Sequence, residues 1–155
     1  DDAGYREFLG RLATPLIARL QPGAQGLDFG SGPGPTLSLM MSEAGYPSAN
    51  YDPIYAPDTS TLDARYDFIC ATEVVEHLRT PKRDLDRLFA MLRPGGTLAI
   101  MTKLVLNRER FSTWHYKNDP THISFFSAET LRWLADSWNA KFERIAADIL
   151  FITRP

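Results

Sequence analysis

The glycine-rich stretch Gly26-Leu27-Asp28-Phe29-Gly30-Ser31-Gly32-Pro33-Gly34-Pro35 constrains the fold of this chain more than any other feature. Its apolar first part predicts a short strand, and Pro35 suits the start of a following helix, where its missing N–H would have no partner anyway. The glycines allow a sharp turn and let a ligand approach the main chain closely. A glycine turn between a strand and a helix is typical of nucleotide sites in open α/β sheets.

Two details of this turn indicate the charge of its ligand. Asp28 lies two residues before the first glycine, where its carboxylate would repel a pyrophosphate and attract an ammonium or sulfonium group. Pro35 stands where a dinucleotide fingerprint has its third glycine, which disfavours a nicotinamide-dependent oxidoreductase. A P-loop is excluded because no Gly-Lys-Ser/Thr follows. These residues fit a cationic, adenosine-bearing ligand best.

Length and composition limit the function classes. A chain of 155 residues predicts a single domain, residues 1–155. The formal net charge of −2 gives no general electrostatic footprint for nucleic acid. Cys70 is the only cysteine, so no internal disulfide can form. No apolar run reaches membrane-spanning length and no signal peptide is visible, so we expect a cytoplasmic protein without a membrane partner and leave its oligomeric state open.

The rest of the chain predicts alternating helices and strands. An apolar stripe from Tyr5 to Leu20 predicts an N-terminal helix on the sheet, either kinked at Pro15 or divided there into two helices. Residues 53–63 leave no room for a helix and a strand together, so we expect the sheet to end early at this edge. The further predicted elements are a helix at 35–44, strands at 49–52, 66–71 and 97–102, helices from 81 and 128, and an antiparallel hairpin at 142–146 and 149–153.

Asp52 is the candidate for ribose binding. It follows the glycine turn by about 20 residues, a spacing at which an acidic residue can accept hydrogen bonds from both ribose hydroxyls. The alternative is a turn aspartate that merely precedes Pro53. The spacing favours the ribose role.

These features together resemble the class I S-adenosylmethionine (SAM)-dependent methyltransferases. The resemblance rests on the acidic-x-G-x-G-x-G pattern at 28–34, on Tyr51-Asp52-Pro53, on 66–78 and on Leu92-Arg93-Pro94-Gly95-Gly96. It implies an α/β, Rossmann-like fold, a mostly parallel twisted sheet with helices on both faces. The family usually has a helix and a strand at 53–63, so its adenine-contacting acidic residue is not carried over to Asp63. The implied SAM-binding residues are Asp28, Gly30, Ser31, Gly32, Asp52, Pro53, Ala71 and Thr72.

A second cluster predicts a metal site. Glu73, Glu76 and His77 are spaced so that a helix would place all three on one face. Two carboxylates and an imidazole are ligands for a divalent cation, and their oxygens favour Mg²⁺ or Mn²⁺. His122 could close the site from the aromatic segment 104–122. The alternatives are a metal-free site with His122 as general base, or acidic residues that only favour a helix N-terminus.

The pattern Glu-x-x-Glu-His also resembles metal-binding residues of ubiquinone-biosynthesis O-methyltransferases and of small-RNA 3′-terminal 2′-O-methyltransferases. In the small-RNA enzymes a second histidine downstream completes the site. His122 matches the place of that histidine. We therefore predict O-methylation of a small-molecule hydroxyl, possible metal assistance, and His122 and His77 as the catalytic residues. The alternatives are a SAM-binding protein without transfer activity and a 2′-O-methyltransferase acting on an RNA 3′ end. The small size and acidic balance favour a small-molecule acceptor over nucleic acid.

Overall fold

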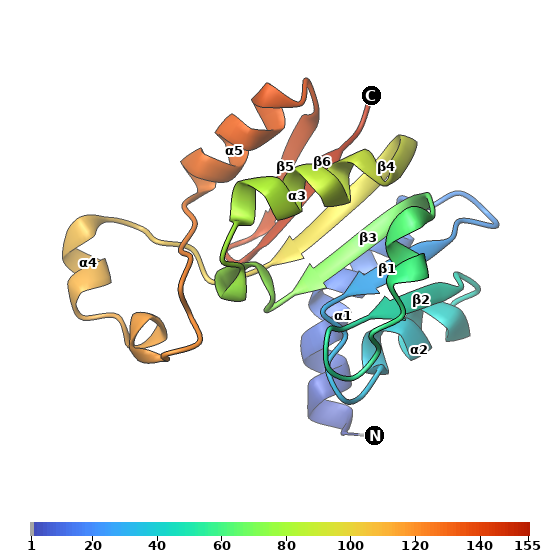
Figure 1. The fold of residues 1–155 in the computed structure, drawn as a ribbon, viewed down its shortest axis with the longest axis horizontal. Coiled ribbons are helices and arrows are strands. Elements are labelled where there is room, and N and C mark those ends of the chain that lie inside the picture. The colour runs from blue at the N-terminus through green and yellow to red at the C-terminus, as the bar shows by residue number, and fades with distance from the viewer. Residues whose placement is uncertain (1) are drawn as a thin grey trace.

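The computed structural model describes residues 2–155, and its centre is a six-stranded sheet in the order β2-β1-β3-β4-β6-β5 (Figure 1). Strands β2, β1, β3 and β4 run parallel to one another, whereas β6 runs antiparallel to both β4 and β5. The predicted Rossmann-like sheet with a C-terminal antiparallel hairpin is confirmed. The strands are β1 Gly26–Phe29, β2 Ser48–Tyr51, β3 Tyr66–Thr72, β4 Leu92–Met101, β5 Lys141–Ala146 and β6 Ile149–Thr153.

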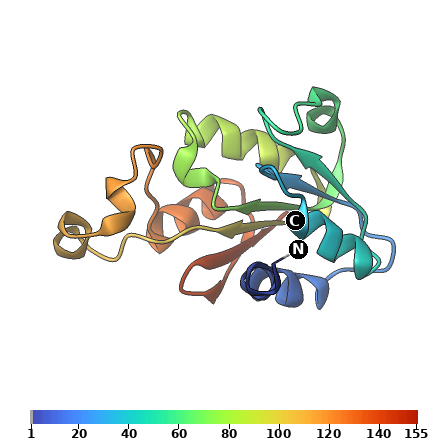
Figure 2. The ribbon, with the colours of Figure 1, turned by 90° about the horizontal axis from the view of Figure 1, so that it is seen from below.

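Helices cover both faces of the sheet. Figure 2 shows α1 and α3 on opposite sides of it. Within residues 2–155 no helix is both long and apolar enough to cross a membrane. The α-helices are α1 Ala3–Ile17, α2 Thr36–Glu43, α3 Pro81–Ala90, α4 Arg108–Ser112 and α5 Ala128–Ser137, and the 3₁₀ turns are η1 Thr59–Asp63, η2 Val75–His77 and η3 His115–Asn118.

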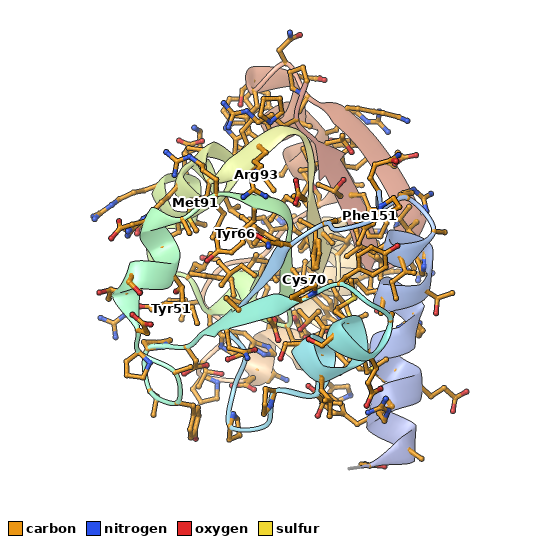
Figure 3. All side chains as sticks on the ribbon, turned by 90° about the vertical axis from the view of Figure 1, so that its right-hand side faces the viewer. Tyr51, Tyr66, Cys70, Met91, Arg93 and Phe151 are labelled. Carbon is orange, nitrogen blue, oxygen red and sulfur yellow. The ribbon has the colours of Figure 1, made fainter. Side chains whose placement is uncertain are left out.

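Each face of the sheet has its own apolar core. Cys70 and Phe151 belong to the core beneath α1 and α2, and Figure 3 shows both on the side of the sheet that α1 covers. Ile69 and Leu98 belong to the core that α3 and α5 cover. Burial, and then the charge of Asp28, raises the pKa of the Cys70 thiol well above its ordinary value. Cys70 is therefore a packing residue and not a reactive thiol.

The N-terminal helix is continuous. α1 runs from Ala3 to Ile17 with Pro15 inside its last turn, so the alternative of two separate helices is wrong. Pro15 has no N–H to donate to the Arg11 carbonyl, so the helix continues to Ile17 without this one hydrogen bond. The helix starts at Asp2, whose carboxylate accepts a hydrogen bond from the Gly4 N–H at 2.9 Å.

The sheet ends at β2, as the short segment 53–63 predicted. In place of a further strand, η1 packs beside β2. Buried Leu62 and a hydrogen bond of 2.6 Å from the Tyr66 hydroxyl to the Thr61 carbonyl hold η1 in place. One boundary differs from expectation. β4 begins at Leu92, before the predicted strand at 97–102, and its pairing with β3 jumps from Leu92 to Thr97, so the strand is irregular at 93–96.

Candidate active site

The glycine turn joins β1 to α2, and its backbone conformation is the one that its glycines predict. Gly30 and Gly32 have φ values of 76° and 69°, in the left-handed region that favours glycine. A Cβ on Gly30 would lie 2.3 Å from a methyl group of Val74, so glycine lets the segment after β3 close against the turn. The helix begins one residue later than predicted, because Pro35 is its N-cap residue.

The N–H groups of this turn are used inside the protein. Those of Gly30 and Ser31 donate to the Tyr51 carbonyl at 2.7 and 3.1 Å, and that of Gly32 donates to Asp52 Oδ2 at 2.9 Å. A Cβ on Gly32 would meet nothing within 4 Å. There is thus open space for a ligand beside Gly32, while these three N–H groups are already occupied and are not free to bind a phosphate.

Asp52 connects the end of β2 with the glycine turn. Its Oδ1 accepts hydrogen bonds from the N–H groups of Ile54 and Tyr55 at 2.9 and 3.0 Å, while Oδ2 accepts the one from Gly32. Burial alone would raise the pKa of the Asp52 carboxyl, but these three backbone donors outweigh it and lower the pKa. The residue is thus an ionised acceptor, and Oδ2 has a lone pair left for a hydroxyl group.

Asp28 is a buried carboxyl group without a full set of partners. Its side chain lies in β1 with 4% exposure, and its Oδ1 has no hydrogen-bond partner among the described residues. Asn50 of β2 is in register with it, and the buried Asn50 Oδ1 also has no partner there. Burial, and to a smaller extent the charge of Asp52, raises the pKa of Asp28 to about 7. A cationic ligand at this position would stabilise the ionised form.

Two cavities meet at the carboxyl ends of β1 and β3. The larger, about 760 Å³, is lined by Asp52, Pro53 and Tyr55 among others. The smaller, about 510 Å³, is lined by Asp28, the glycine turn, Thr72 and the α1 residue Tyr5. Both are lined by Gly30 and Glu73, so they form one cleft across the glycine turn. Ala71, by contrast, is fully buried in β3.

Glu73 stands where the two cavities meet. It has a φ of 54°, a left-handed conformation that costs a non-glycine residue of order 1–3 kcal/mol and is enriched at functional sites. Burial, and next the charge of Glu76, raises the pKa of Glu73 to about 7. Tyr116, from the aromatic segment, donates a hydrogen bond to Glu73 Oε2 at 3.1 Å. Because burial raises the pKa of this phenol, it stays protonated as a donor.

A polar network continues from Tyr116 to the end of β4. Its hydroxyl lies 3.3 Å from Thr102 Oγ1, which donates to Glu76 Oε2 at 2.8 Å. Glu76 is fully buried, and its second oxygen, Oε1, has no hydrogen-bond partner among the described residues. A buried carboxylate oxygen without a donor is costly, so this position favours a positively charged neighbour.

The structure brings Glu76, His77 and His122 together. One ligand atom of each lies within 4.8 Å of the others, and the two imidazole rings are 4.9 Å apart. His77 Nδ1 lies 2.9 Å from the Thr121 carbonyl, and His122 Nδ1 lies 2.6 Å from the Tyr116 carbonyl. Since a carbonyl only accepts, both Nδ1 atoms carry a proton, and in the neutral imidazole the Nε2 atom then keeps a lone pair. Nε2 of His77 lies 3.8 Å from Glu76 Oε1, and Nε2 of His122 lies 3.5 Å from Asp119 Oδ2.

The predicted reason for this grouping is wrong, although three of the four residues do meet. The segment is not an α-helix. Glu73 is left-handed and Val75–His77 is a 3₁₀ turn, so Glu73 does not share a helical face with Glu76 and His77. Glu73 also lies outside the group of three potential metal ligands. Sequence reasoning missed Tyr5, Thr102 and Tyr116, which join the site only through tertiary packing.

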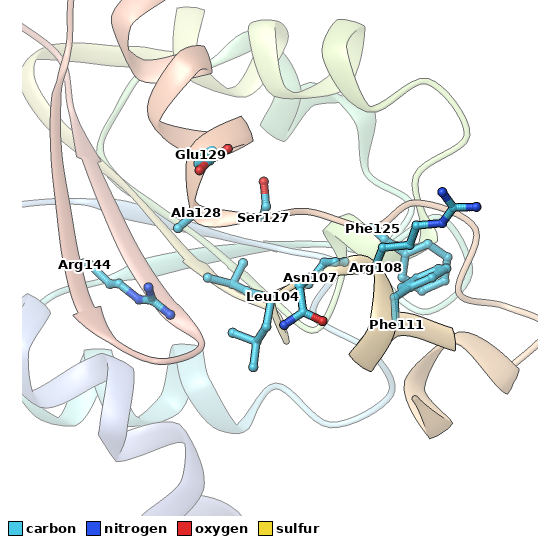
Figure 4. Close-up of a pocket in the computed structure, with 11 residues that line it drawn as sticks. Leu104, Asn107, Arg108, Phe111, Phe125, Ser127, Ala128, Glu129 and Arg144 are labelled. Atoms are coloured by element: carbon cyan, nitrogen blue, oxygen red, sulfur yellow. The ribbon is translucent and has the colours of Figure 1, made fainter. Parts of the chain in front are cut away.

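A third cavity lies away from the cleft (Figure 4). It has about 620 Å³ and is bounded by the segment after β4, the start of α5 and Arg144 of β5. Phe111 and Phe125 form one wall, and their rings are 5.2 Å apart. Phe125 also lies 6.5 Å from Tyr116, so this aromatic cluster separates the cavity from the polar network.

The fold is that of a methyltransferase domain, and the sequence agrees. Residues 3–144 match the methyltransferase domain family, and the chain belongs to this family. Two curated proteins are similar over short segments. The biotin biosynthesis bifunctional protein BioCD of Bordetella avium is 44% identical over 54 residues, which cover 35% of this chain and 11% of that protein. The mitochondrial ubiquinone biosynthesis O-methyltransferase of Dictyostelium discoideum is 40% identical over 40 residues, which cover 26% of this chain and 12% of that protein. The matches thus span only about a tenth of these relatives.

Solved structures show the same fold. A SAM-dependent methyltransferase from Archaeoglobus fulgidus has a TM-score of 0.69 and 17% identity, covering 88% of this chain and 69% of that one. Magnesium protoporphyrin IX methyltransferase from Synechocystis PCC 6803, with bound S-adenosylhomocysteine (SAH), has a TM-score of 0.68 and 16% identity, covering 98% and 84%. The 1,6-didemethyltoxoflavin-N1-methyltransferase of Burkholderia thailandensis has a TM-score of 0.63 and 18% identity, covering 99% of this chain and 78% of that one.

Proposed function

We propose that this protein is a SAM-dependent methyltransferase that methylates a hydroxyl group of a small molecule. The observation that carries the proposal is the cleft, with an ionised acceptor, Asp52, in one part and the unpartnered carboxyl of Asp28 in the other. SAM has a neutral adenosine end and a methionine end with an ammonium, a carboxylate and a sulfonium group. Asp52 can accept hydrogen bonds from the ribose hydroxyls at the first end, and Asp28 can pair with a cationic group at the second.

The residues of the cleft then have distinct tasks. Asp52 Oδ2 accepts from a ribose hydroxyl, and Pro53 and Tyr55 border the adenosine part. Asp28 and the carbonyl oxygens of the glycine turn bind the ammonium group. The sulfonium falls near Glu73, where the two cavities meet. When bound, SAM supplies an electrophilic methyl group, and the protein has to align a nucleophile behind it and exclude water.

We further propose that Glu76, His77 and His122 hold a divalent cation. The donor set fits, because both histidines present an Nε2 lone pair and Glu76 Oε1 lacks a partner. Nδ1–H groups that donate to backbone carbonyls are the usual support of metal-binding histidines. Two imidazoles favour Mn²⁺ over Mg²⁺. A cation at this place would lower the pKa of a substrate hydroxyl. Without a cation, His122 Nε2 is the available proton acceptor.

Cofactor binding is tested first, by calorimetry with SAM and with NAD on folded protein. We expect micromolar binding of SAM and none of NAD. The absence of heat with SAM would remove the proposal, and binding of NAD would favour an oxidoreductase.

Methyl transfer is tested with labelled SAM, a pool of hydroxyl-bearing metabolites and mass spectrometry of the products. We expect EDTA to stop transfer and Mn²⁺ to restore it. His122→Ala and Glu76→Gln should lose activity, whereas His115→Ala, which changes the exposed histidine of the same segment, should keep it. Full activity in EDTA would refute the proposed metal site but would leave the proposed methyltransferase activity standing. Methylation of an RNA 3′ end instead of any metabolite would favour the nucleic-acid alternative, and SAM binding without any transfer would favour a binding protein.

A further inference from the structure

The first turn of α1 forms a wall of the methionine part of the cleft. Leu9, Leu12 and Leu16 of α1 are buried on the sheet, and Tyr5 lies one turn before Leu9 on the same stripe. Figure 1 shows that the N-terminal end of α1 extends past the sheet. There Tyr5 is 45% exposed and lines the smaller cavity together with Asp28.

Other contacts fix the position of this helix. Arg11 pairs with Asp148 in the β5–β6 turn, with 2.5 Å between guanidinium and carboxylate. The Asp148 carbonyl in turn accepts the Thr102 N–H at 3.0 Å, which links α1 to the end of β4. The Tyr5 ring stacks on Phe8, with 6.3 Å between centroids and 16° between planes. The ring is therefore held beside the cavity before any ligand arrives.

The surroundings of Tyr5 are negatively charged. After burial, the charges of Asp28 and Glu73 are the causes that raise the pKa of its phenol, so both carboxyl groups lie near it. The described lining of the smaller cavity includes Asp2 as a further carboxylate and no lysine or arginine. An aromatic ring among carboxylates, on the wall of a cleft, is an arrangement that attracts a cation to the face of the ring.

We propose that the Tyr5 ring contacts the sulfonium of SAM and distinguishes it from the uncharged thioether of SAH. The inference rests on the proposed function, because it assigns a specificity-determining residue to the same cleft. Cation–π attraction acts on the sulfonium and is absent for the thioether. Tyr5 therefore favours the methyl donor over the product, which limits product inhibition.

The test compares dissociation constants of SAM and SAH for three variants by calorimetry. Tyr5→Leu should raise the Kd of SAM about tenfold and that of SAH by less than about twofold. Tyr5→Phe keeps the ring and should leave both constants within about twofold of wild type. Tyr55→Leu is the control, since Tyr55 is an exposed tyrosine that lines the adenosine part, and it should weaken SAM and SAH equally.

The ratio of the two constants separates recognition of charge from packing. If Tyr5→Leu weakens SAM and SAH equally, or weakens neither, the inference is wrong. It is also wrong if Tyr5→Phe loses the preference, because the hydroxyl would then carry it. If wild-type protein binds neither ligand, the proposed function itself fails. Thermal melting confirms that each variant is folded, as the partial exposure of Tyr5 leads us to expect.

Discussion

Replacing Asp28 by asparagine should stabilise the protein at high pH. The carboxyl group is 4% exposed, and its pKa is raised from 3.8 to about 7, mainly by burial. The folded state thus holds this proton more firmly than the unfolded chain. Its contribution to stability is complete below about pH 4 and is lost as the pH rises to about 7. Above that pH the loss amounts to about 4 kcal/mol, at roughly 1.36 kcal/mol for each pKa unit.

The variant Asp28→Asn removes this titration. By the same relation, about 1.5 kcal/mol of the loss has occurred by pH 5 and the rest follows by pH 8. The unfolding free energy of Asp28→Asn relative to wild type should therefore rise by about 2–3 kcal/mol between these pH values. The new amide can also donate to Asn50 Oδ1, which has no partner among the described residues. Cofactor binding should be lost in exchange, because the charge that attracts the methionine end is gone.

Urea unfolding without SAM, followed by tryptophan fluorescence at several pH values, measures this difference. Glu7→Gln, which removes an exposed carboxylate of α1, is the control for a general effect of one negative charge. A difference between Asp28→Asn and wild type that stays constant from pH 5 to pH 8 would refute the reasoning. Asp28 would then titrate like an ordinary surface carboxyl group.

Three further substitutions test other parts of the structure. Asp52→Ala should raise the Kd of SAM at least about tenfold in calorimetry, because unpaired ribose hydroxyls cost about 1–3 kcal/mol; an unchanged Kd would contradict the ribose role. Gly30→Ala should cost about 1–3 kcal/mol of stability in thermal melting, because of its positive φ and the contact with Val74. Adding Val74→Ala to Gly30→Ala should recover only the part of the lost stability that comes from the steric contact. Full recovery of the stability would show that alanine at position 30 is not strained by its positive φ. Trp138→Phe should cost about 1 kcal/mol in urea unfolding, because it removes the 2.7 Å hydrogen bond from the indole N–H to Asp86; no cost would mean that this bond adds nothing.

The arrangement of Asp28, the glycine turn and Asp52 around one cleft could be predicted because its signals are local. Asp28, Gly30 and Gly32 follow one another along a strand and a turn, and the positive φ values of the glycines are a direct consequence of residue type. Asp52 follows at a spacing that a strand–helix–strand unit imposes. The early end of the sheet could also be predicted from the sequence, since residues 53–63 are too few for a helix and a strand.

The grouping of Glu73, Glu76 and His122 depends on contacts that no local pattern specifies. Tyr116 reaches Glu73, and His122 reaches Glu76, only because the segment after β4 folds back over the end of β3. The prediction from residue spacing assumed that Glu73 lies in a helix, whereas the chain turns there because Glu73 has a left-handed conformation. Tyr5 looked like one more apolar residue of a helical stripe. That it lies past the edge of the sheet depends on where α1 is anchored.

The support of the two histidines has a consequence for how this protein can diverge. Their Nδ1 atoms are held by the backbone carbonyls of Thr121 and Tyr116, and a carbonyl is present whatever the side chain. Mutations can therefore change many side chains of this segment, and with them the shape offered to an acceptor, while both imidazoles keep the same tautomer. Under the proposed function, a change of substrate therefore involves other side chains than the two histidines that take part in the chemistry. On the same proposal, a change of side chains in this segment alters the acceptor site and leaves the backbone support of both imidazoles in place.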